Sequence, residues 1–371
     1  MISPPFRAEH IGSFLRPAKL LEARKEQEAG RIDLAALRAI EDEAIRDAVK
    51  LQEELGFKCV TDGELRRESY SENFTVSGLS GIEAGWAASG KWAHADDEGN
   101  PRAGRVTTVR GPIKWNASQN AENLKFLQSL TKALPKMTLP GPAYVHFRAG
   151  RKNISHDVYP NIDDFWNDIV AAYRKELAVL AEAGCRYLQF DETSFAKFGD
   201  PKIRAALAER GENWQDVFHK YIEVTNAVVS GPPAGMRIGM HLCRGNIAGH
   251  WQAEGGYDVV AETLFKRSNI DLFLLEYDSP RAGTFEPLKF LPDHKVVVLG
   301  VISTKVAELE PEDLIISRVQ EAAKYVSMDR LALSPQCGFA SVHQGNKISP
   351  EQQKAKLRLV VDLAQRLWRE N

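Results

Sequence analysis

Apolar runs of strand length alternate with amphipathic stretches along the whole chain. Short runs rich in branched and aromatic residues predict β-strands, whereas apolar residues spaced three and four apart predict helices. Eight runs are predicted as parallel strands: residues 7–11, 59–62, 143–147, 187–191, 237–241, 272–276, 296–301 and 331–334. The clearest predicted helices are residues 34–55, 163–183, 214–229, 311–326 and 350–369.

Eight strands that alternate with helices predict an α/β fold, specifically a (β/α)8 TIM barrel that occupies residues 1–371 as one unit. The exception is the stretch 66–139, which contains the segment GLSGIEAGWAASG and an alternating run at 106–109. We predict that this stretch is an insertion between strands two and three, forming a β-hairpin or a small subdomain. Active sites of such barrels lie at the carboxyl ends of the strands, so residues that follow the eight runs are the candidates for chemistry.

The composition is that of an ordinary globular protein, with 43% hydrophobic and 26% charged residues. A formal net charge of -2 creates no field that favours nucleic acid or an anionic membrane. No run of about 18 apolar residues occurs, and the amino terminus lacks the basic start and apolar run of a secretory leader. We therefore expect a cytoplasmic protein whose four cysteines are reduced thiols.

The most specific local pattern is His241-Leu242-Cys243 at the end of the fifth predicted strand. Residues i and i+2 of a strand share a face, so the imidazole and the thiol can converge on one ion. Glu276 ends the next predicted strand and Cys337 follows the eighth, which brings all four side chains to one rim. Such a set suits Zn²⁺ with an exchangeable position. A buried cysteine or a hydrogen-bonded histidine is the ordinary alternative, and we assign that role to the other two cysteines, Cys59 and Cys185.

Other polar residues also follow predicted strands: Ser13, Asp62, Glu64, Asp191, Glu192 and Asp278. Apolar strands that run into carboxylates are typical of loops that bind a cation or a metal, although such an acid can instead cap the next helix. Arginines beside them could hold a substrate carboxylate. The motifs GxSxG, HExxH and GxGxxG are missing, which argues against the common hydrolases, zincins and dinucleotide enzymes.

Taken together, these segments resemble the cobalamin-independent methionine synthases, in particular their carboxyl-terminal catalytic barrel and its short single-barrel relatives. The matching segments are HIGSFLRP, VTDGELRR, YLQFDETSFA, MHLCRGN, LLEYDSPRAG and LSPQCGF. They occur in the family's order and cover nearly the whole chain.

The resemblance implies a zinc-dependent S-methyltransferase that converts homocysteine to methionine. It implies that His241, Cys243, Glu276 and Cys337 bind catalytic Zn²⁺. It also implies that Ser13, Glu64 and Asp191 hold the amino-acid part of the thiol substrate. Zinc would keep that thiol ionised near neutral pH, where a free thiol of pKa about 8.5 is mostly protonated.

Two departures from the long synthases leave the substrates open. Ser303, in GVISTKVAELE, stands at or near the place of the family's proton-donating histidine, so the general acid is unassigned. Only one barrel fits in 371 residues. A methylfolate is the expected donor, and a methylated corrinoid protein or a small methyl donor are the alternatives. The acceptor could be another thiol such as coenzyme M, or the zinc could be structural in a corrinoid- or folate-binding module.

Overall fold

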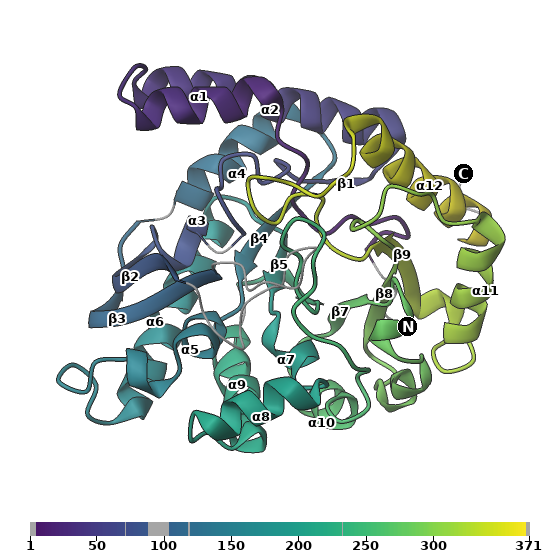
Figure 1. Ribbon diagram of the computed structural model, residues 1–371. Helices are drawn as coiled ribbons and strands as arrows, with labels where there is room; N and C mark the ends of the chain where they lie inside the picture. Colours follow the sequence, from purple (N-terminus) through teal and green to yellow (C-terminus); the bar gives the residue numbers. More distant parts are fainter. Residues whose placement is uncertain (1–4, 71, 88–103, 118, 232, 369–371) are drawn as a thin grey trace.

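The computed structural model describes residues 5–70, 72–87, 104–117, 119–231 and 233–368. Within these residues, seven parallel strands form one curled sheet in the order β1-β4-β5-β6-β7-β8-β9. Figure 1 shows the strands at the centre of the molecule with the helices arranged around them. The strands of this sheet are β1 (Cys59–Val60), β4 (Leu134–Pro140), β5 (Tyr187–Asp191), β6 (Arg237–Leu242), β7 (Leu272–Glu276), β8 (Val296–Ile302) and β9 (Leu331–Pro335).

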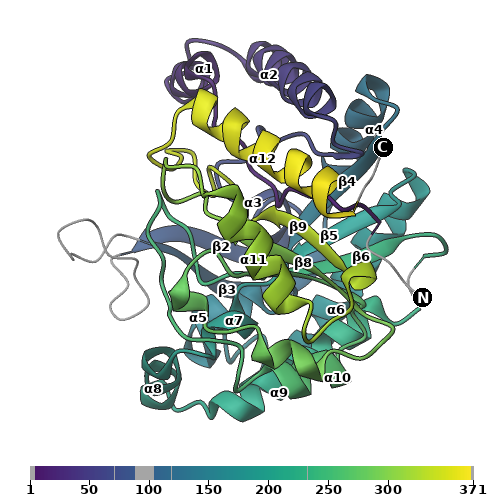
Figure 2. The ribbon, with the colours of Figure 1, turned by 90° about the vertical axis from the view of Figure 1, so that its right-hand side faces the viewer.

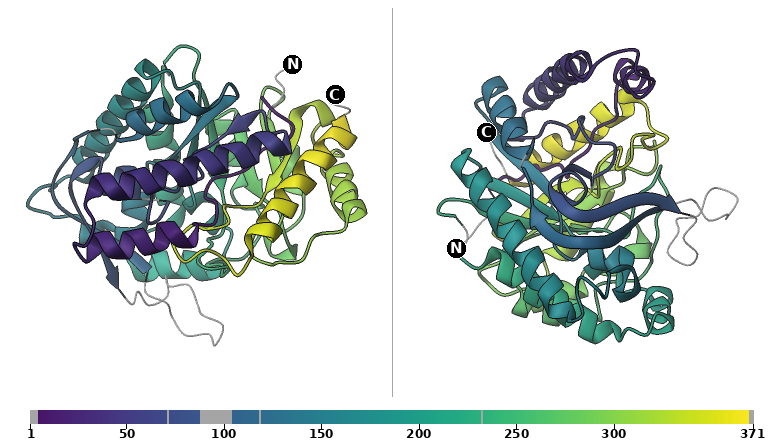
Figure 3. Two further views of the ribbon diagram at one scale, coloured as in Figure 1. Left: turned by 90° about the horizontal axis from the view of Figure 1, so that it is seen from above. Right: turned by 90° about the vertical axis from the view of Figure 1, so that its left-hand side faces the viewer.

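Long amphipathic helices cover the outside of the sheet, as their spacing of apolar residues predicts. The helices are α1 (Ala18–Glu28), α2 (Leu34–Leu55), α3 (Glu72–Thr75), α4 (Gln119–Leu130), α5 (Tyr144–Ala149), α6 (Ile162–Glu182), α7 (Ser194–Lys197), α8 (Pro201–Glu209), α9 (Trp214–Val229), α10 (Ala261–Arg267), α11 (Glu312–Ala322) and α12 (Pro350–Trp368). Figure 2 shows α11 and α12 side by side outside β8 and β9. Figure 3 shows that α1 and α2 also lie side by side. The five predicted helices are confirmed to within a few residues at each end; the last predicted residue, 369, lies outside the described part.

One predicted strand is wrong. Residues 143–147 belong to the buried helix α5, and the third strand of the sheet is β4, which begins nine residues earlier. Two polar side chains interrupt the apolar pattern of β4 because both are used in the interior. Lys136 Nζ pairs with the carboxylate of Glu9 at 3.0 Å, and the Thr138 hydroxyl donates to Glu64 at 2.7 Å.

The predicted first strand, residues 7–11, is reduced to an isolated bridge between Ala8 and Leu333 of β9. Its backbone bonds are Glu9 N–H to Leu333 O at 2.9 Å and Leu333 N–H to Arg7 O at 2.8 Å. The sheet of the described residues therefore has seven strands rather than the expected eight. The segment still matters for the site, because it leads directly into Gly12 and Ser13.

The strands β2 (Leu79–Ala87) and β3 (Gly104–Trp115) form a separate antiparallel pair within the stretch 66–139. The residues between them, 88–103, lie outside the described part. Buried Glu176 of α6 anchors this region, because it accepts hydrogen bonds from Trp115 Nε1 and Asn120 Nδ2, both at 2.8 Å. The last residues of the stretch belong to β4 of the parallel sheet. No helix in the described ranges has the length and apolar character needed to cross a membrane.

Candidate metal and substrate site

A pocket lies at the carboxyl ends of the strands. Its walls come from segments far apart in the sequence, since residues after β1, β4, β5, β6 and β9 all reach it. The predicted site residues in its lining are Ser13, Glu64, Asp191, His241, Cys243 and Cys337. The structure therefore brings six of the seven residues predicted to bind metal or substrate to one cavity.

Three predicted metal ligands meet in this pocket. His241 lies near the end of β6, Cys243 follows that strand by one residue, and Cys337 follows β9 by two. Their ligand atoms all lie within 4.8 Å of one another, and all three side chains are buried. His241 Nδ1 lies 3.2 Å from the carbonyl oxygen of Leu274, an arrangement in which Nδ1 donates and Nε2 carries the lone pair. Nε2 is buried without a hydrogen-bond partner, as expected of a nitrogen that binds a metal.

The charges of these side chains also suit a cation. The Cys337 thiol donates to Cys243 and, together with His241, holds the pKa of Cys243 well below its usual range. The pKa of Cys337 is raised by the same contact with Cys243 and by burial. These contacts favour the thiolate form of Cys243, which is the form that binds a metal. Two soft sulfur ligands and an imidazole nitrogen fit a metal such as zinc and leave a position for a further ligand.

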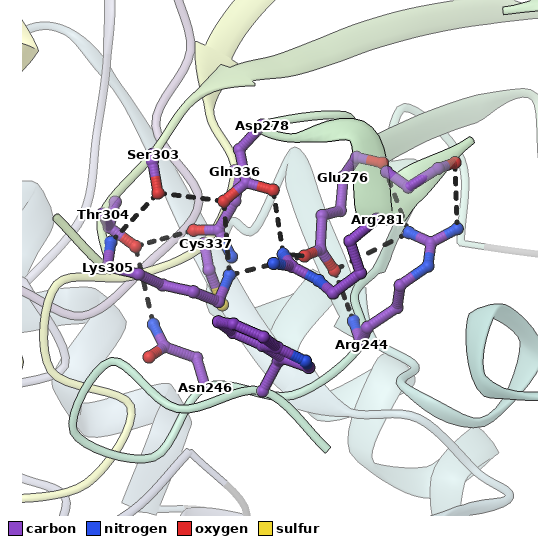
Figure 4. A network of polar contacts seen from close by, with 12 residues as sticks. Arg244, Asn246, Glu276, Asp278, Arg281, Ser303, Thr304, Lys305, Gln336 and Cys337 are labelled. Carbon is purple, nitrogen blue, oxygen red and sulfur yellow. Dashed lines mark hydrogen bonds and ion pairs between the residues drawn. The ribbon is translucent and has the colours of Figure 1, made fainter. Parts of the chain in front are cut away.

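Glu276, the fourth predicted ligand, lies outside this group of three. Its carboxylate accepts hydrogen bonds from Arg244 N and from Arg281 Nη2, each at 2.5 Å, and Lys305 Nζ lies at 3.4 Å (Figure 4). Burial alone would raise the pKa of this carboxyl, but Lys305, Arg244 and Arg281 outweigh burial and lower it. Glu276 is therefore a buried anion, and its role as a metal ligand stays a prediction.

Glu64 is held in place by several contacts. Its carboxylate accepts from the Thr138 hydroxyl at 2.7 Å and pairs with Arg67 Nη1 at 3.2 Å. Its backbone has φ +56°, a left-handed conformation that non-glycine residues seldom adopt. The Asp62 carboxylate accepts from the Glu64 N–H at 2.9 Å, which fixes that turn. Asp62 therefore fixes the turn that presents Glu64 to the pocket. It is not a helix cap, because the next helix, α3, begins at Glu72.

Asp191 ends β5 and lines the same wall. Its carboxylate accepts from Gln189 Nε2 at 2.7 Å, and the same amide group donates to Ile11 O at 2.8 Å. Burial and the nearby Glu64 raise the pKa of Asp191 to about 7. Two carboxyl groups in one pocket favour a ligand with an ammonium group, because a cation relieves their mutual repulsion.

Two glycines allow the walls of the pocket to approach closely. A Cβ on Gly12 would lie 2.5 Å from Glu64 Oε1, and a Cβ on Gly338 would lie 2.1 Å from Ser13 Oγ. Gly338 follows Cys337 directly, so Ser13 packs against the loop that carries one of the sulfurs. The amino-terminal segment and the loop after β9 thus form a single wall.

Ser303, which stands near the family's proton-donor position, is bound elsewhere. Its hydroxyl donates to Asp278 Oδ2 at 2.9 Å and accepts from the Lys305 N–H at 3.2 Å (Figure 4). It is not among the residues that line the pocket. Sequence reasoning missed Lys305, whose ammonium lies between the carboxylates of Glu276 and Asp278.

The sequence analysis also did not single out two basic residues of the pocket wall, Arg148 and Lys197. Arg148 was hidden by the wrong strand at 143–147, because it lies in α5. Lys197 is the last residue of α7 and directly follows the quoted segment YLQFDETSFA. This position shortly after β5 was the available signal.

The chain is similar to proteins of one family. The family model described as "Cobalamin-independent synthase, Catalytic domain" matches residues 6–366. YxjH of Bacillus subtilis is 39% identical over 98% of this chain and 95% of its own length. The Bacillus licheniformis protein named 5-methyltetrahydropteroyltriglutamate–homocysteine methyltransferase is 23% identical over 95% of this chain, which spans 42% of that longer protein.

Solved structures agree with this match. A structure described as a putative vitamin-B12-independent methionine synthase from Listeria monocytogenes has a TM-score of 0.76 and 33% identity, with both chains fully covered. A B12-independent methionine synthase from Shewanella, solved with selenomethionine, has a TM-score of 0.74 at 20% identity over 98% of each chain, which supports the fold alone. The chain therefore belongs to the family of cobalamin-independent synthase catalytic domains, whose members are methionine synthase-like methyltransferases.

Proposed function

We propose that this protein is a zinc-dependent methyltransferase that methylates the thiol of homocysteine to give methionine. The observation that carries the proposal is the buried group formed by His241, Cys243 and Cys337, whose ligand atoms all lie within 4.8 Å of one another. These three residues would hold the zinc, and Glu276 is the predicted fourth ligand. When bound, Zn²⁺ supplies a Lewis acid that keeps the substrate sulfur ionised at neutral pH.

In this proposal the protein's own residues bind and orient the acceptor. Glu64 and Asp191 bind the ammonium group of homocysteine. Ser13, which packs against Gly338 next to Cys337, helps to hold the amino-acid part of the same substrate. The burial of these side chains keeps water from the reacting sulfur. The methyl group then moves from a donor nitrogen to the sulfur, with the C–N bond breaking as the C–S bond forms. The amine that leaves must gain a proton.

A methylfolate is the proposed donor, as in the relatives whose names specify one. A methylcorrinoid protein or a small methyl donor are the alternatives. From a methylcorrinoid the Co–C bond would break as the C–S bond forms, the electron pair would stay on cobalt, and no amine would need a proton. We also propose that residues 1–371 are a single catalytic barrel in which segment 7–11 closes the sheet. The bridge from Ala8 to β9 supports this closure, as does the bond from the Phe14 N–H to Gly63 O beside β1.

Metal analysis tests the zinc site. Protein purified without chelator should contain about one zinc per chain, and Cys243→Ser should lose most of the zinc and of the methionine formed with homocysteine. Cys185→Ser is the matched control, because this buried thiol donates to Tyr187 O at 3.4 Å, away from the pocket. Full zinc and full activity in Cys243→Ser would disprove the proposal.

A methyl-acceptor assay tests the substrates. Homocysteine and coenzyme M are each offered with methylfolate, methylcobalamin and small donors, and the products are followed by mass. Methionine formed from homocysteine with any of these donors supports the proposed acceptor. Methylation of coenzyme M but not of homocysteine would disprove homocysteine as the acceptor and would show that the acceptor is another thiol.

A further inference from the structure

Two cationic side chains line the pocket without a role in the proposed methyl transfer. Arg148 reaches it from α5, after β4, and Lys197 reaches it from α7, after β5. Within the described part of the chain, neither side chain forms an ion pair with a carboxylate. They therefore differ from the cations around Glu276, which are all paired with acids.

Lys197 is the more deeply buried of the two, with 1% of its surface exposed. Its ammonium donates to the hydroxyl of Thr193 at 3.2 Å and lies 5.5 Å from the centre of the Phe147 ring. The nearest acid in sequence, Glu192, uses Oε1 to accept from the Ser194 N–H. Burial, followed by repulsion from Arg148, lowers the pKa of Lys197 to about 7. Cys243, Glu192 and Glu276 offset this repulsion only in part, and none of them pairs directly with the ammonium. An anion in the pocket that contacts the buried ammonium directly would therefore be favourable.

Arg148 interacts with two tyrosines and keeps one donor unused. Its side chain interacts with the hydroxyls of Tyr70 and Tyr144, whereas its Nε is buried without a hydrogen-bond partner. Its guanidinium carbon lies 6.0 Å from the centre of the Tyr144 ring. Tyr70, which packs edge-on against Tyr144, also lines the pocket. A guanidinium has five N–H donors in a planar fork that matches an oxyanion.

We propose that Arg148 and Lys197 form a subsite for an oxyanion carried by a substrate, a carboxylate, sulfonate or phosphate. Glu64 and Asp191 give the pocket an anionic region for an ammonium group, and these two residues give it a cationic one. This proposal rests on the proposed function, because the ligand of the subsite is taken to be a substrate of the methyl transfer. The oxyanion has two possible sources: the α-carboxylate of the acceptor or an anionic group of the methyl donor.

Binding measurements separate these sources. Lys197→Met and Arg148→Met are titrated calorimetrically with homocysteine and with 3-aminopropane-1-thiol, which lacks the carboxylate. They are also titrated with 5-methyltetrahydrofolate and with a 5-methyltetrahydropterin that lacks the glutamate. Lys202→Met is the matched control, because Lys202 is exposed on α8. Methionine keeps an unbranched apolar side chain, close in length to lysine and shorter than arginine, without the charge. Thermal unfolding of each variant checks its folding.

If the acceptor supplies the oxyanion, Lys197→Met weakens the binding of homocysteine about tenfold or more, because a hydrogen bond between two charged groups is lost. The binding of the decarboxylated thiol weakens less than twofold. If the donor supplies it, the same contrast appears between methylfolate and the pterin. Equal effects on the charged and neutral members of both pairs, or no effect on any ligand, would overturn the subsite.

A second readout separates this proposal from the proposed function. Inorganic phosphate at millimolar concentration should raise the thermal unfolding temperature of the wild type and of Lys202→Met, and should not do so for Lys197→Met. This result can hold even if no methionine is ever formed, so failure of the methyl-acceptor assay and failure of the subsite are distinguishable. A phosphate response that is the same in all three proteins would count against the subsite.

Discussion

Glu64 shows how single residues shape the pocket. Its left-handed backbone costs on the order of 1–3 kcal/mol, and the surrounding contacts maintain that conformation. Asp62 fixes the turn, Arg67 and Thr138 hold the carboxylate, and the missing side chain of Gly12 leaves space for it. Strain of this kind persists where the surroundings hold a residue firmly, and functional pockets are common places for it.

Gly12→Ala should therefore impair the substrate pocket and spare the metal. The new Cβ would lie 2.5 Å from Glu64 Oε1, so the carboxylate must move. We expect binding of homocysteine to weaken about tenfold, or about 1.4 kcal/mol, with the zinc content unchanged. Calorimetry and metal analysis measure the two effects.

Gly85→Ala is the control for this substitution, because a Cβ there meets nothing within 4 Å. Unchanged homocysteine binding in Gly12→Ala would show that Glu64 does not contact the substrate. A loss of zinc in the same variant would show that the two parts of the site are not independent.

His10 makes the stability of the fold sensitive to acid. Burial, with a contribution from Lys136, lowers the pKa of His10 to about 3. The unfolded chain, with a histidine pKa of about 6.5, takes up this proton first as the pH falls. The free energy of unfolding should thus be unaffected above pH 6.5 and decrease progressively from there towards pH 3.

His10→Leu should remove this contribution. Between pH 7 and pH 5 the free energy of unfolding should fall by about 2 kcal/mol less in the variant than in the wild type. This difference corresponds to about 1.36 kcal/mol for each pH unit below 6.5. Urea unfolding at the two pH values measures the difference. His294→Gln, at a side chain that is 61% exposed, should follow the wild type. Identical pH dependence in His10→Leu and the wild type would refute this account.

At the scale of elements, the strands and helices with a clear period were predictable and the exceptions have physical causes. β5 and β7, both wholly buried, were predicted with their observed ends, because a continuous apolar run bounded by polar residues is distinctive. The run at 143–147 was misread because a short apolar run does not distinguish a strand from a buried helix. β4 was missed because Lys136 and Thr138 point into an interior where Glu9 and Glu64 receive them.

The candidate site was predictable where its residues lie at the ends of strands. His241, Cys243 and Cys337, the proposed metal ligands, could be found in this way, as could the acidic residues Glu64 and Asp191, because the sequence marks the end of each strand. The electrostatic partners of Glu276 could not be found, since Arg281 and Lys305 reach it through loops whose course is set by tertiary packing.

The contact between Glu176 and the β2–β3 pair allows a test at the scale of elements. Glu176→Ala leaves Trp115 Nε1 and Asn120 Nδ2 without this acceptor, so we expect a destabilisation of about 2–3 kcal/mol, typical of hydrogen bonds to a buried charge. Urea unfolding monitored by tryptophan fluorescence measures it. Glu182→Ala, at an exposed position of the same helix, should change stability by less than about 0.5 kcal/mol. Equal stabilities of the two variants would show that Glu176 does not anchor β3.

At the scale of the whole molecule, the proposed metal would connect distant parts of the sheet. His241 lies in β6 and Cys243 directly follows this strand. Cys337 lies in the loop after β9, and β9 is three strands away from β6 in the sheet. A ligand that binds only the folded state stabilises it, by about 2.7 kcal/mol at a hundred times its dissociation constant. Binding of the proposed metal should therefore raise the stability of the whole sheet.

Removal of metal by a chelator should lower the thermal unfolding temperature by several degrees, and added Zn²⁺ should restore it. Cys337→Ser should unfold at the lower temperature with or without chelator. Differential scanning calorimetry measures both. A chelator response in Cys337→Ser as large as in the wild type would place the metal elsewhere.

The packing of Gly338 against Ser13 has a consequence for biosynthesis. A ribosome makes the chain from its amino end, so Ser13, Glu64, Asp191, His241 and Cys243 are all translated before the codon of Cys337 is read. The seam between the segment at 7–11 and β9 can form only when those last residues have left the exit tunnel. A nascent chain thus has neither all three of His241, Cys243 and Cys337 nor a finished pocket wall. These three residues could hold the proposed metal together only after nearly the entire polypeptide has been translated.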